Sequence, residues 1–344
     1  MNKLNRRKFL QTTALGAGAL APMPLTAMNR SGAANLPRLP REVWIASFCQ
    51  HMMNNPGPDE MMEKALAEID GIAYYEPDMI CLPETFLYSH MKQDRPSLAE
   101  EADRMEKEVI PRFAEYAIKH SSYIICPVYT VRDGYYFNSA VVIDRKGKTM
   151  GEYHKIHPTE GEISRGLAPG SLDPPVFKTD IGIIGIQICF DINWQDGWEA
   201  LRKKGAEIIF WPSAFGGGQQ VNTMAWQNKC CTVSSTKYGV SKICDVNGTE
   251  VAATGHWSEH WAIGPLNLEK AFLHTWPYVL RFPEIEKKYG RRIRIRNHHE
   301  EEWSIIESLS PDVRVADILD EFDLKTHEQH IASAESVQLK YRPF

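Results

Sequence analysis

A buried strand followed by a change of pattern stands in the middle of the chain. Residues 181–194 read I-G-I-I-G-I-Q-I-C-F-D-I-N-W, an almost continuous apolar and β-branched run. A half-buried strand would alternate with polar residues, so this run predicts a strand that is buried on both faces. Asp196 as a cap and Gly205 as a stop then predict a short helix over 196–204.

Cys189 stands where this strand turns toward the helix, at the carboxyl end of the strand. That edge of an α/β sheet is where ligands bind and where nucleophiles are presented. Most cysteines are nevertheless small core residues. The strand alone leaves both interpretations open and makes Cys189 a candidate nucleophile.

Similar apolar runs along the chain predict the remaining elements. Strands are expected at 43–50, 78–83, 123–130 and 207–212, with hairpins at 135–154 and 240–254, the second turning at Asn247-Gly248. Helices are expected at 58–73, 98–119 and 223–231. This order departs from strict βαβ alternation, so we expect two mixed sheets packed face to face with helices outside.

The composition shifts from about Asn267 onward. A basic stretch, R-R-I-R-I-R at 291–296, precedes a predicted helix at 312–336. The alternation of isoleucine and arginine predicts an edge strand with positive side chains, and a carboxylate-binding strip is a second interpretation. We place the main domain at 42–282 and a C-terminal extension at 283–344.

Residues 1–34 resemble an address for export. Arg6-Arg7 are followed by Phe9-Leu10 and by a weakly apolar run over 12–21, as in a twin-arginine signal. The run is too short and too polar for a transmembrane anchor, and a basic tail is the alternative. We therefore expect a soluble, exported product, periplasmic or extracellular, without a stable membrane anchor.

Composition and charge narrow the classes of function. With 344 residues, 43% of them hydrophobic, the chain can bury a full core. The net charge of −5 becomes more negative once the basic residues of 1–34 are set aside, which argues against nucleic acid as a partner.

The seven cysteines predict free thiols more than disulfides. Their number is odd, and Cys49, Cys81, Cys126 and Cys189 lie in apolar, strand-like runs. The adjacent pair Cys230-Cys231 matches no zinc spacing, so we expect no metal site.

Two further polar residues follow predicted strands. Glu84, in C-L-P-E-T-F, comes directly after a strand and a proline, where a capping or surface acid is the alternative. Lys155, in Y-H-K-I-H, ends the returning strand of the first hairpin, where most lysines are solvated. Here it stands among two histidines and the acids Glu160 and Glu162.

The runs C-L-P-E-T-F, Y-H-K-I-H and G-I-Q-I-C-F-D, in this order, resemble the three signature segments of the nitrilase superfamily of carbon–nitrogen hydrolases. The runs F-N-S-A-V-V-I-D, W-P-S-A-F and D-V-N-G-T-E-V add further matches. The resemblance covers about residues 42–266 and leaves the extension outside. It implies an α-β-β-α four-layer sandwich of two mixed sheets, a homodimer or higher homo-oligomer, and a Glu-Lys-Cys catalytic set without a cofactor.

In that set Cys189 is the nucleophile, and Glu84 takes its proton and later returns one to the leaving nitrogen. The cation of Lys155 and the backbone N–H of Phe190 face the oxyanion. The cycle runs through a thioester on Cys189 and releases ammonia or an amine. The resemblance also implies a second glutamate, which we assign to Glu162 with Glu160 as the alternative.

Asp191 matches an aromatic–acid pair of the family, and we expect it to orient the turn. Phe86, Tyr88, Trp194 and Phe215 are candidates for the substrate pocket, although all four could equally be packing residues. The expected activity is hydrolysis of a small amide or N-carbamoyl amide. The alternatives are a nitrilase with the same triad, an acyltransferase, whose branch is membrane-embedded, and a non-catalytic binding scaffold.

Overall fold

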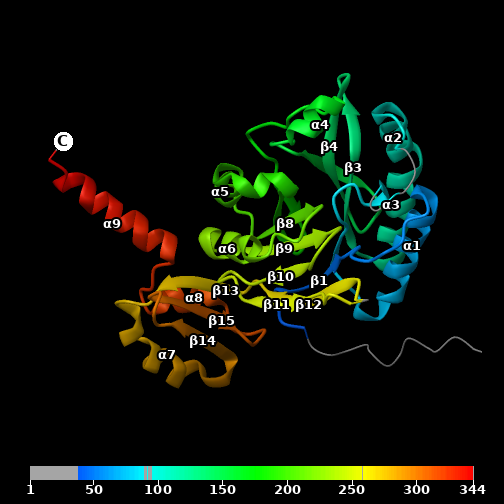
Figure 1. Cartoon of the computed structure of the whole chain (residues 1–344). Coiled ribbons are helices and arrows are strands. Elements are labelled where there is room, and N and C mark those ends of the chain that lie inside the picture. Colours follow the sequence, from blue (N-terminus) through cyan, green and yellow to red (C-terminus); the bar gives the residue numbers. More distant parts are fainter. Residues whose placement is uncertain (1–37, 89–90, 92–94, 258, 344) are drawn as a thin grey trace, which may run out of the picture. The chain divides into compact units, whose positions relative to one another are not determined.

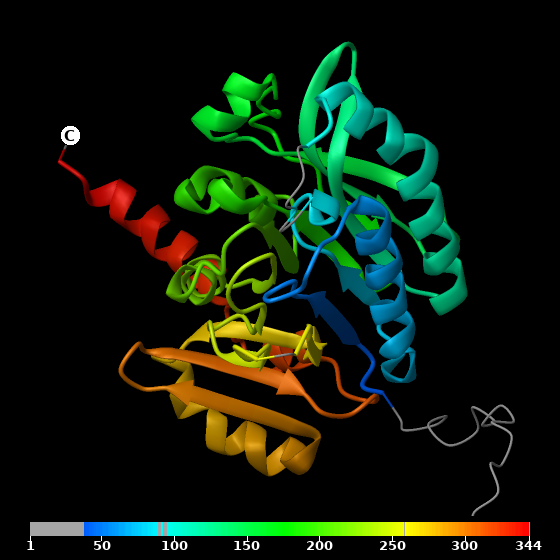
Figure 2. The same cartoon turned by 45° about the vertical axis from the view of Figure 1, so that its right-hand side comes forward.

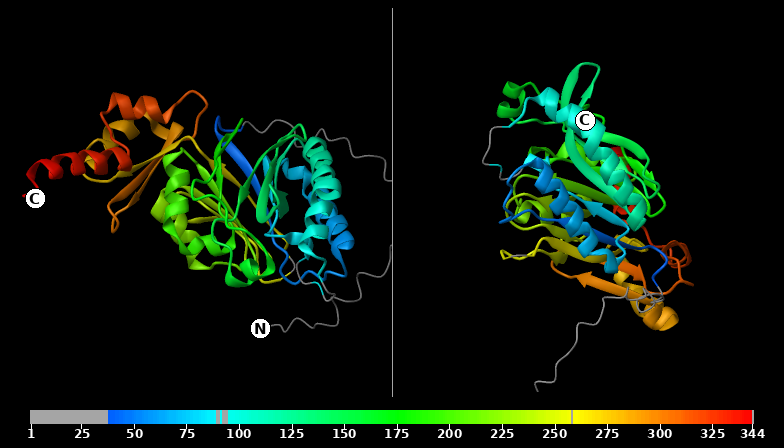
Figure 3. Two further views of the ribbon diagram at one scale, coloured as in Figure 1. Left: turned by 90° about the horizontal axis from the view of Figure 1, so that it is seen from above. Right: turned by 90° about the vertical axis from the view of Figure 1, so that its right-hand side faces the viewer.

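Two six-stranded sheets pack face to face, and helices cover the outer face of each (Figures 1 and 3). The structure, a computed structural model, describes residues 38–88, 91, 95–257 and 259–343. The predicted export signal at 1–34 lies outside these residues. Within them, no helix combines the length and the apolar character that crossing a bilayer requires.

The first sheet has the order β12-β1-β2-β3-β4-β5. Its strands are β1 (Glu42–Phe48), β2 (Met79–Cys81), β3 (Tyr123–Arg132), β4 (Tyr135–Ile143), β5 (Thr149–His154) and β12 (Trp261–Asn267). The central strands β1, β2 and β3 run parallel, and the outer strands pair antiparallel.

The second sheet has the order β11-β10-β9-β8-β7-β6. Its strands are β6 (Phe177–Thr179), β7 (Gly182–Ile186), β8 (Ile208–Ser213), β9 (Cys231–Thr236), β10 (Lys242–Cys244) and β11 (Glu250–Ala253). Here β7, β8 and β9 run parallel between antiparallel neighbours.

Alternate side chains of the inner strands enter different layers. Ile45 of β1 packs between the sheets against residues such as Ile186 of β7, whereas its neighbour Ala46 faces the helices beside Phe113. Gly185 of β7 lies so close to Leu201 that a Cβ there would stand 2.9 Å from its methyl groups. The strands are therefore buried on both faces, and the predicted four-layer sandwich is confirmed.

The outer layers are helical. The helices are α1 (Pro58–Gly71), α2 (Leu98–Arg104) and α3 (Ile110–His120) beside the first sheet, α4 (Glu160–Arg165) after β5, and α5 (Gln195–Lys203) and α6 (Gln219–Asn228) beside the second sheet. The predicted helix at 98–119 contains a π turn at Met105–Val109, directly before Pro111, whose missing N–H interrupts the regular hydrogen bonding. Asp196 lies inside the first turn of α5 and is not its cap.

Several strands escaped prediction, and β9 and β12 show why. The run C-T-V-S-S-T of β9 is too polar for a recognisable core strand, but its hydroxyls have partners far along the chain, such as Ser235 Oγ and the carbonyl of Phe48 at 2.6 Å. β12 contains Gly264 and Pro265, which usually end strands. It lies at the edge of its sheet, where a proline costs no ladder bond.

The C-terminal part forms a third, three-stranded sheet of order β13-β15-β14 (Figure 2). Its elements are β13 (Lys270–His274), β14 (Ile293–His298), β15 (Trp303–Ser308), α7 (Phe282–Tyr289), α8 (Val315–Glu321) and α9 (His327–Tyr341). The predicted boundary at 282/283 divides this sheet, since β13 pairs with β15. The start of the small sheet at Lys270 lies closer to the composition shift at Asn267 than to this predicted boundary.

The predicted edge strand at 291–296 is confirmed as β14, and its arginines bind carboxylates of the chain itself. Arg294 pairs with Glu307 at 2.7 Å and Arg296 with Asp245 at 2.6 Å. The single helix expected at 312–336 is wrong. Asp323 takes a left-handed conformation (φ 51°) after α8, and the capping box of Thr326 starts α9, which extends away from the body (Figures 1 and 2).

Candidate active site

Three strand ends meet between the two large sheets. Glu84 follows β2 and Lys155 follows β5 in the first sheet, and Cys189 follows β7 in the second. All three side chains are almost fully buried. Lys155 Nζ donates to Glu84 Oε1 at 2.9 Å, and the Cys189 thiol lies close enough to the Glu84 carboxylate for each group to shift the pKa of the other. The structure thus brings together the three residues that the sequence places far apart.

A second carboxylate completes this cluster. Glu162 Oε2 accepts from Lys155 Nζ at 2.8 Å, and Glu162 Oε1 accepts from Asn138 Nδ2 at 2.7 Å. The same Asn138 nitrogen donates to Glu84 Oε1 at 2.7 Å, so the amide bridges both acids. Asn138 lies within the F-N-S-A-V-V-I-D run, but no local signal identified it as a site residue.

The capping of α4 explains why the Glu162 side chain belongs to the cluster and that of Glu160 does not. Thr159 and Glu162 form the capping box of α4, in which the Thr159 backbone N–H donates to Glu162 Oε2 at 2.8 Å. This pins the Glu162 carboxylate at the helix start, beside Lys155. Glu160, two residues earlier, is exposed to solvent.

Cys189 occupies a sharp turn. Its φ is 47°, a left-handed conformation that is rare for a residue with a side chain, and it begins the 3-10 turn Cys189–Asn193. The indole N–H of Trp211 holds its carbonyl at 2.9 Å.

The buried Asp191 carboxylate also holds the turn at Cys189 in place. It accepts from the hydroxyl of Tyr153 at 2.7 Å and from the backbone N–H groups of Ile188 and His157, each at 2.8 Å. Asp191 therefore positions the Cys189 turn against β5.

The charges around the thiol oppose one another. Burial and the nearby Glu84 carboxylate raise the pKa of Cys189 to about 12, although Lys155, the Ala214 backbone amide and the Ser213 hydroxyl act against this rise. A protonated thiol is therefore the resting form.

The carboxylate and the ammonium keep their charges. Burial disfavours the ionised form of Glu84, but the ammonium groups of Lys155 and Lys237 overcome it and lower the pKa of Glu84. Burial likewise opposes the charge of Lys155, and Glu84, Cys189 and Glu162 raise its pKa well above the ordinary value. A protonated thiol beside an ionised carboxylate is the arrangement that general base catalysis needs.

Lys237, which sequence reasoning missed, is the second ammonium of this site. It directly follows β9, is 9% exposed, and donates from Nζ to Thr85 Oγ1 at 2.7 Å. Its pKa is lowered to about 8, because burial outweighs the favourable field of Glu84 and because Arg95 adds repulsion.

Aromatic side chains of different exposure surround the cluster. Phe190, Trp194 and Phe215 are each a little more than a third exposed, and Trp194 stacks on His157 with ring centroids 4.0 Å apart. These positions are compatible with a substrate rim.

Two of the pocket candidates have packing roles instead. Phe86 is fully buried in the helix-facing layer, edge-on to Phe113, and Tyr88 lies in the same layer beneath Arg95. Their places in this layer favour the packing interpretation for both residues.

The cysteines and potential metal ligands add no second centre. All seven cysteines are buried and free of disulfides, as predicted. Among the residues that the structure describes, no three His, Cys, Asp or Glu side chains are grouped to hold a metal ion.

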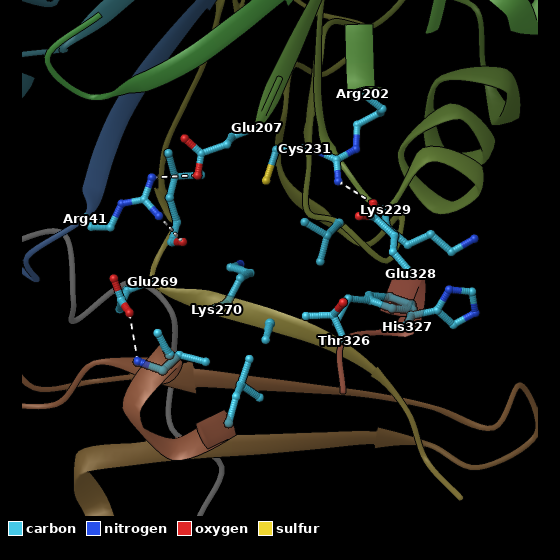
Figure 4. A pocket seen from close by; sticks show the side chains of 17 residues that line it. Arg41, Arg202, Glu207, Lys229, Cys231, Glu269, Lys270, Thr326, His327 and Glu328 are labelled. Atoms are coloured by element: carbon cyan, nitrogen blue, oxygen red, sulfur yellow. Dashed lines mark hydrogen bonds and ion pairs between the residues drawn. The ribbon is translucent and has the colours of Figure 1, made fainter. Parts of the chain in front are cut away.

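A separate pocket of about 340 Å³ lies between the second sheet and the small C-terminal sheet (Figure 4). Glu207 and Cys231 mark the amino ends of β8 and β9 there, whereas Cys189 follows the carboxyl end of the parallel β7. Its charged groups largely pair with one another, as Arg41 does with Glu207 at 2.6 Å. This pocket therefore lies at the opposite end of the strands from the catalytic candidates.

Comparison with known proteins gives a consistent picture. Residues 45–272 match the family model described as carbon-nitrogen hydrolase. The deaminated glutathione amidase of Synechocystis sp. is 24% identical over 185 residues, 50% of this chain and 66% of the relative. The mouse deaminated glutathione amidase is 30% identical over 143 residues, 34% of this chain and 44% of the relative. The chain thus spans less than two thirds of these curated relatives.

Solved structures show the same fold at low identity. A carbon-nitrogen hydrolase from Helicobacter pylori superposes with a TM-score of 0.59 at 19% identity, over 72% of this chain and 93% of that one. An amidase from Nesterenkonia sp. AN1, in which the acetamide moiety of fluoroacetamide is added covalently to the active-site cysteine, gives 0.57 at 16% identity, over 65% and 90%.

Proposed function

Because the chain belongs to the carbon–nitrogen hydrolase family, we propose that it hydrolyses a small amide or N-carbamoyl amide through a thioester on Cys189. The observation that carries this proposal is the buried Glu84 carboxylate, which accepts from the Lys155 ammonium at 2.9 Å and lies near the Cys189 thiol, whose pKa it raises. One base thus lies near both the nucleophile and the cation that such a reaction requires.

The first step transfers the acyl group. The thiol is mostly protonated, so its proton moves to Glu84 as the sulfur–carbon bond forms. The carbonyl oxygen becomes an oxyanion, which the Lys155 ammonium and the Phe190 backbone N–H stabilise. Glu84 then returns the proton to the nitrogen, the carbon–nitrogen bond breaks, and ammonia or an amine leaves.

The second step regenerates the enzyme. Water attacks the thioester carbon and gives one proton to Glu84, which passes it to the departing Cys189 sulfur. Glu162 and Asn138 act as positioning residues, because their hydrogen bonds fix the Lys155 ammonium and the Glu84 carboxylate. Each step conserves charge and needs no further reactant than water.

We favour an amide over a nitrile as the substrate, because the relatives and the structural neighbour described above are amidases. A nitrilase with the same triad would release acid and ammonia from a nitrile without a free amide. A non-catalytic scaffold fits poorly, since burying an ammonium and two carboxylates together costs free energy that a binding role would not need.

Export and self-association also remain part of the proposal. The Arg6-Arg7 pattern supports twin-arginine export to the periplasm or beyond. The family resemblance supports a homo-oligomer, and neither point bears on the chemistry at Cys189.

The test is ammonia release by the full chain across small amides, N-carbamoyl amino acids and nitriles. Cys189→Ala is expected to lower kcat/KM by about a thousandfold or more. Cys126→Ala, a buried cysteine in the helix-facing layer, serves as the matched control and keeps turnover. Equal turnover in wild type and Cys189→Ala would refute the proposal.

A further inference from the structure

We propose that the imidazoles of His274, His327 and His330 form an acid-sensitive latch, which holds α9 against the small C-terminal sheet at neutral pH and releases it when the rings gain protons. This histidine latch lies outside the catalytic cluster and goes beyond the proposed hydrolysis. Its basis is the small number of contacts that join α9 to the rest of the chain.

α9 is attached through its first turn and then extends away from the body (Figure 1). None of its 15 residues is buried, and Tyr341 near its end is 82% exposed. Within the described residues, the ring contacts and ion pairs that join α9 to other elements come from His327, His330 and Glu328. A helix of this length is only marginally stable alone in water, so these contacts decide whether α9 stays in place.

Three histidine rings meet where α9 lies against β13. The rings of His330 and His274 are nearly parallel, with centroids 4.8 Å apart, and the His327 ring lies 6.4 Å from that of His274. His327 also stands edge-on to Phe272 and Trp303, at 5.7 and 5.5 Å. Neutral aromatic rings attract one another at these distances. The neutral imidazoles therefore fasten α9 to the small sheet.

Protonation would turn this attraction into repulsion. Charged side chains from several parts of the chain lie around the three rings: Arg202 of α5, Lys229 after α6, Asp323 and Lys325 before α9, and Glu328 within α9. Lys229 opposes a positive charge on His327, and Glu328 favours one. That carboxylate is already paired with Arg202 at 2.9 Å, and its side chain is 68% exposed. The rings of Trp303 and Tyr278, from β15 and the 3-10 turn Tyr278–Leu280, carry no charge to offset the new ones.

The pKa values of the latch agree with this geometry. Burial first, and then Lys229 and the two other histidines, lower the pKa of His327 to about 4. Burial, His274 and Lys325 lower the pKa of His330 as well. A histidine in water has a pKa of about 6.5.

A histidine whose pKa is lower in the attached state favours attachment above its free pKa and favours release as the pH falls below that value. Between pH 6.5 and pH 4, protonation of His327 alone therefore shifts the equilibrium toward release by up to about tenfold per pH unit. Protonation of His330 acts in the same direction.

Release of α9 would open the separate pocket of Figure 4. Thr326, His327 and Glu328 form part of its wall, and Phe272 lines it beside them. The left-handed Asp323 separates α8 from α9, so α9 can leave while α8 stays packed on the small sheet. Acid would thus remove one wall of the pocket and uncover Phe272.

Hydrogen exchange of the full chain, followed by mass spectrometry at pH 7.5 and pH 5.0, tests the latch. Dividing the exchange rate of an unstructured peptide at the same pH by each measured rate gives a protection factor for α9 and for α7. Because Phe282 and Ile285 of α7 pack on the same small sheet, α7 reports on unfolding of the whole sheet.

We expect the protection factor of α9 to fall by at least about tenfold from pH 7.5 to pH 5.0, while that of α7 stays within about twofold. His327→Phe/His330→Phe keeps two rings but cannot be protonated, so its α9 should stay protected at pH 5.0. His330→Lys places a permanent charge beside His274 and should reduce protection of α9 already at pH 7.5. His299→Phe, at an exposed position, should behave as the wild type.

Equal protection of α9 at both pH values in the wild type would overturn the latch, and this comparison needs no variant. A fall that persists in His327→Phe/His330→Phe, or one that α7 shares, would overturn it too, because the acid-sensitive group would then lie elsewhere. Turnover plays no part in these measurements, so their outcome is independent of the proposed function.

Discussion

The Lys155 ammonium lies 2.9 Å from Glu84 Oε1 and is 1% exposed, so the two charges form an ion pair that is nearly sealed from water. Glu162 contacts the same ammonium at 2.8 Å. Two carboxylates therefore share the Lys155 ammonium. Removing one partner of a buried pair costs more than the pair itself contributes, because it leaves an uncompensated charge.

Lys155→Met is expected to lower the free energy of unfolding by about 3–5 kcal/mol at pH 8, because Glu84 and Glu162 are left facing one another. Lowering the pH toward 5 should recover part of this loss, since one carboxylate can then be protonated. Urea unfolding at the two pH values measures the effect.

The double variant Lys155→Met/Glu162→Gln separates charge from catalysis. It should regain stability at pH 8 but no turnover, because the oxyanion still lacks its cation. A single variant as stable as the wild type at pH 8 would contradict the reliance of both acids on Lys155.

Glu162→Gln should lower kcat by about ten- to a hundredfold with a small change in KM, because the amide no longer anchors the ammonium electrostatically. Glu160→Gln is the matched control, because Glu160 lies two residues before Glu162 and is exposed to solvent. This variant should retain the wild-type kcat. Steady-state kinetics on the preferred amide decide between them. A larger effect at Glu160 would reverse the assignment of the accessory acid.

The small C-terminal sheet should detach more easily in acid. Lys270 and Arg296 each approach Asp245 to 2.6 Å, and although burial opposes it, Lys270 first and Arg296 next lower the pKa of Asp245 to about 2. A depressed pKa gives stability above the unfolded value near 4 that is lost as the pH falls toward 2.

Asp245→Asn should therefore lower the free energy of unfolding at pH 7 by about 2 kcal/mol and flatten its dependence between pH 4 and pH 2. Asp312→Asn removes an exposed partner of Arg292 and should change the unfolding free energy far less. Thermal unfolding across this pH range measures both. An unchanged acid profile in Asp245→Asn would exclude Asp245 as the acid-sensitive group.

The positions of Glu84, Lys155 and Cys189 could be predicted because each directly follows a strand with a clear apolar pattern. The local sequence shows that each polar residue stands at the end of its strand, and the order of the three motifs indicates that the three residues act together. Lys237 could not be predicted in this way, since β9 carries serine and threonine at buried positions. Their hydroxyls are satisfied by distant groups such as the Phe48 carbonyl, which no local pattern reveals.

Tertiary pairing also explains the errors at the chain's end. β13 closely follows Asn267 and belongs to the small sheet only because it pairs with β15, which lies about 30 residues further along the chain. Its register is thus set by a distant strand, which a local pattern does not reveal. The break between α8 and α9 depends on the left-handed conformation of Asp323 and on Thr326, which caps α9. Aspartate and threonine also occur inside helices, so their presence alone did not predict the break.

The most direct test of the account is intact-mass spectrometry of the full chain, quenched during turnover of the preferred amide. The account predicts a transient mass increase equal to the amide minus ammonia, mapped to Cys189, decaying as acid is released, and missing in Cys189→Ala. Turnover without any adduct on Cys189, or an adduct on another residue, would contradict the thioester mechanism.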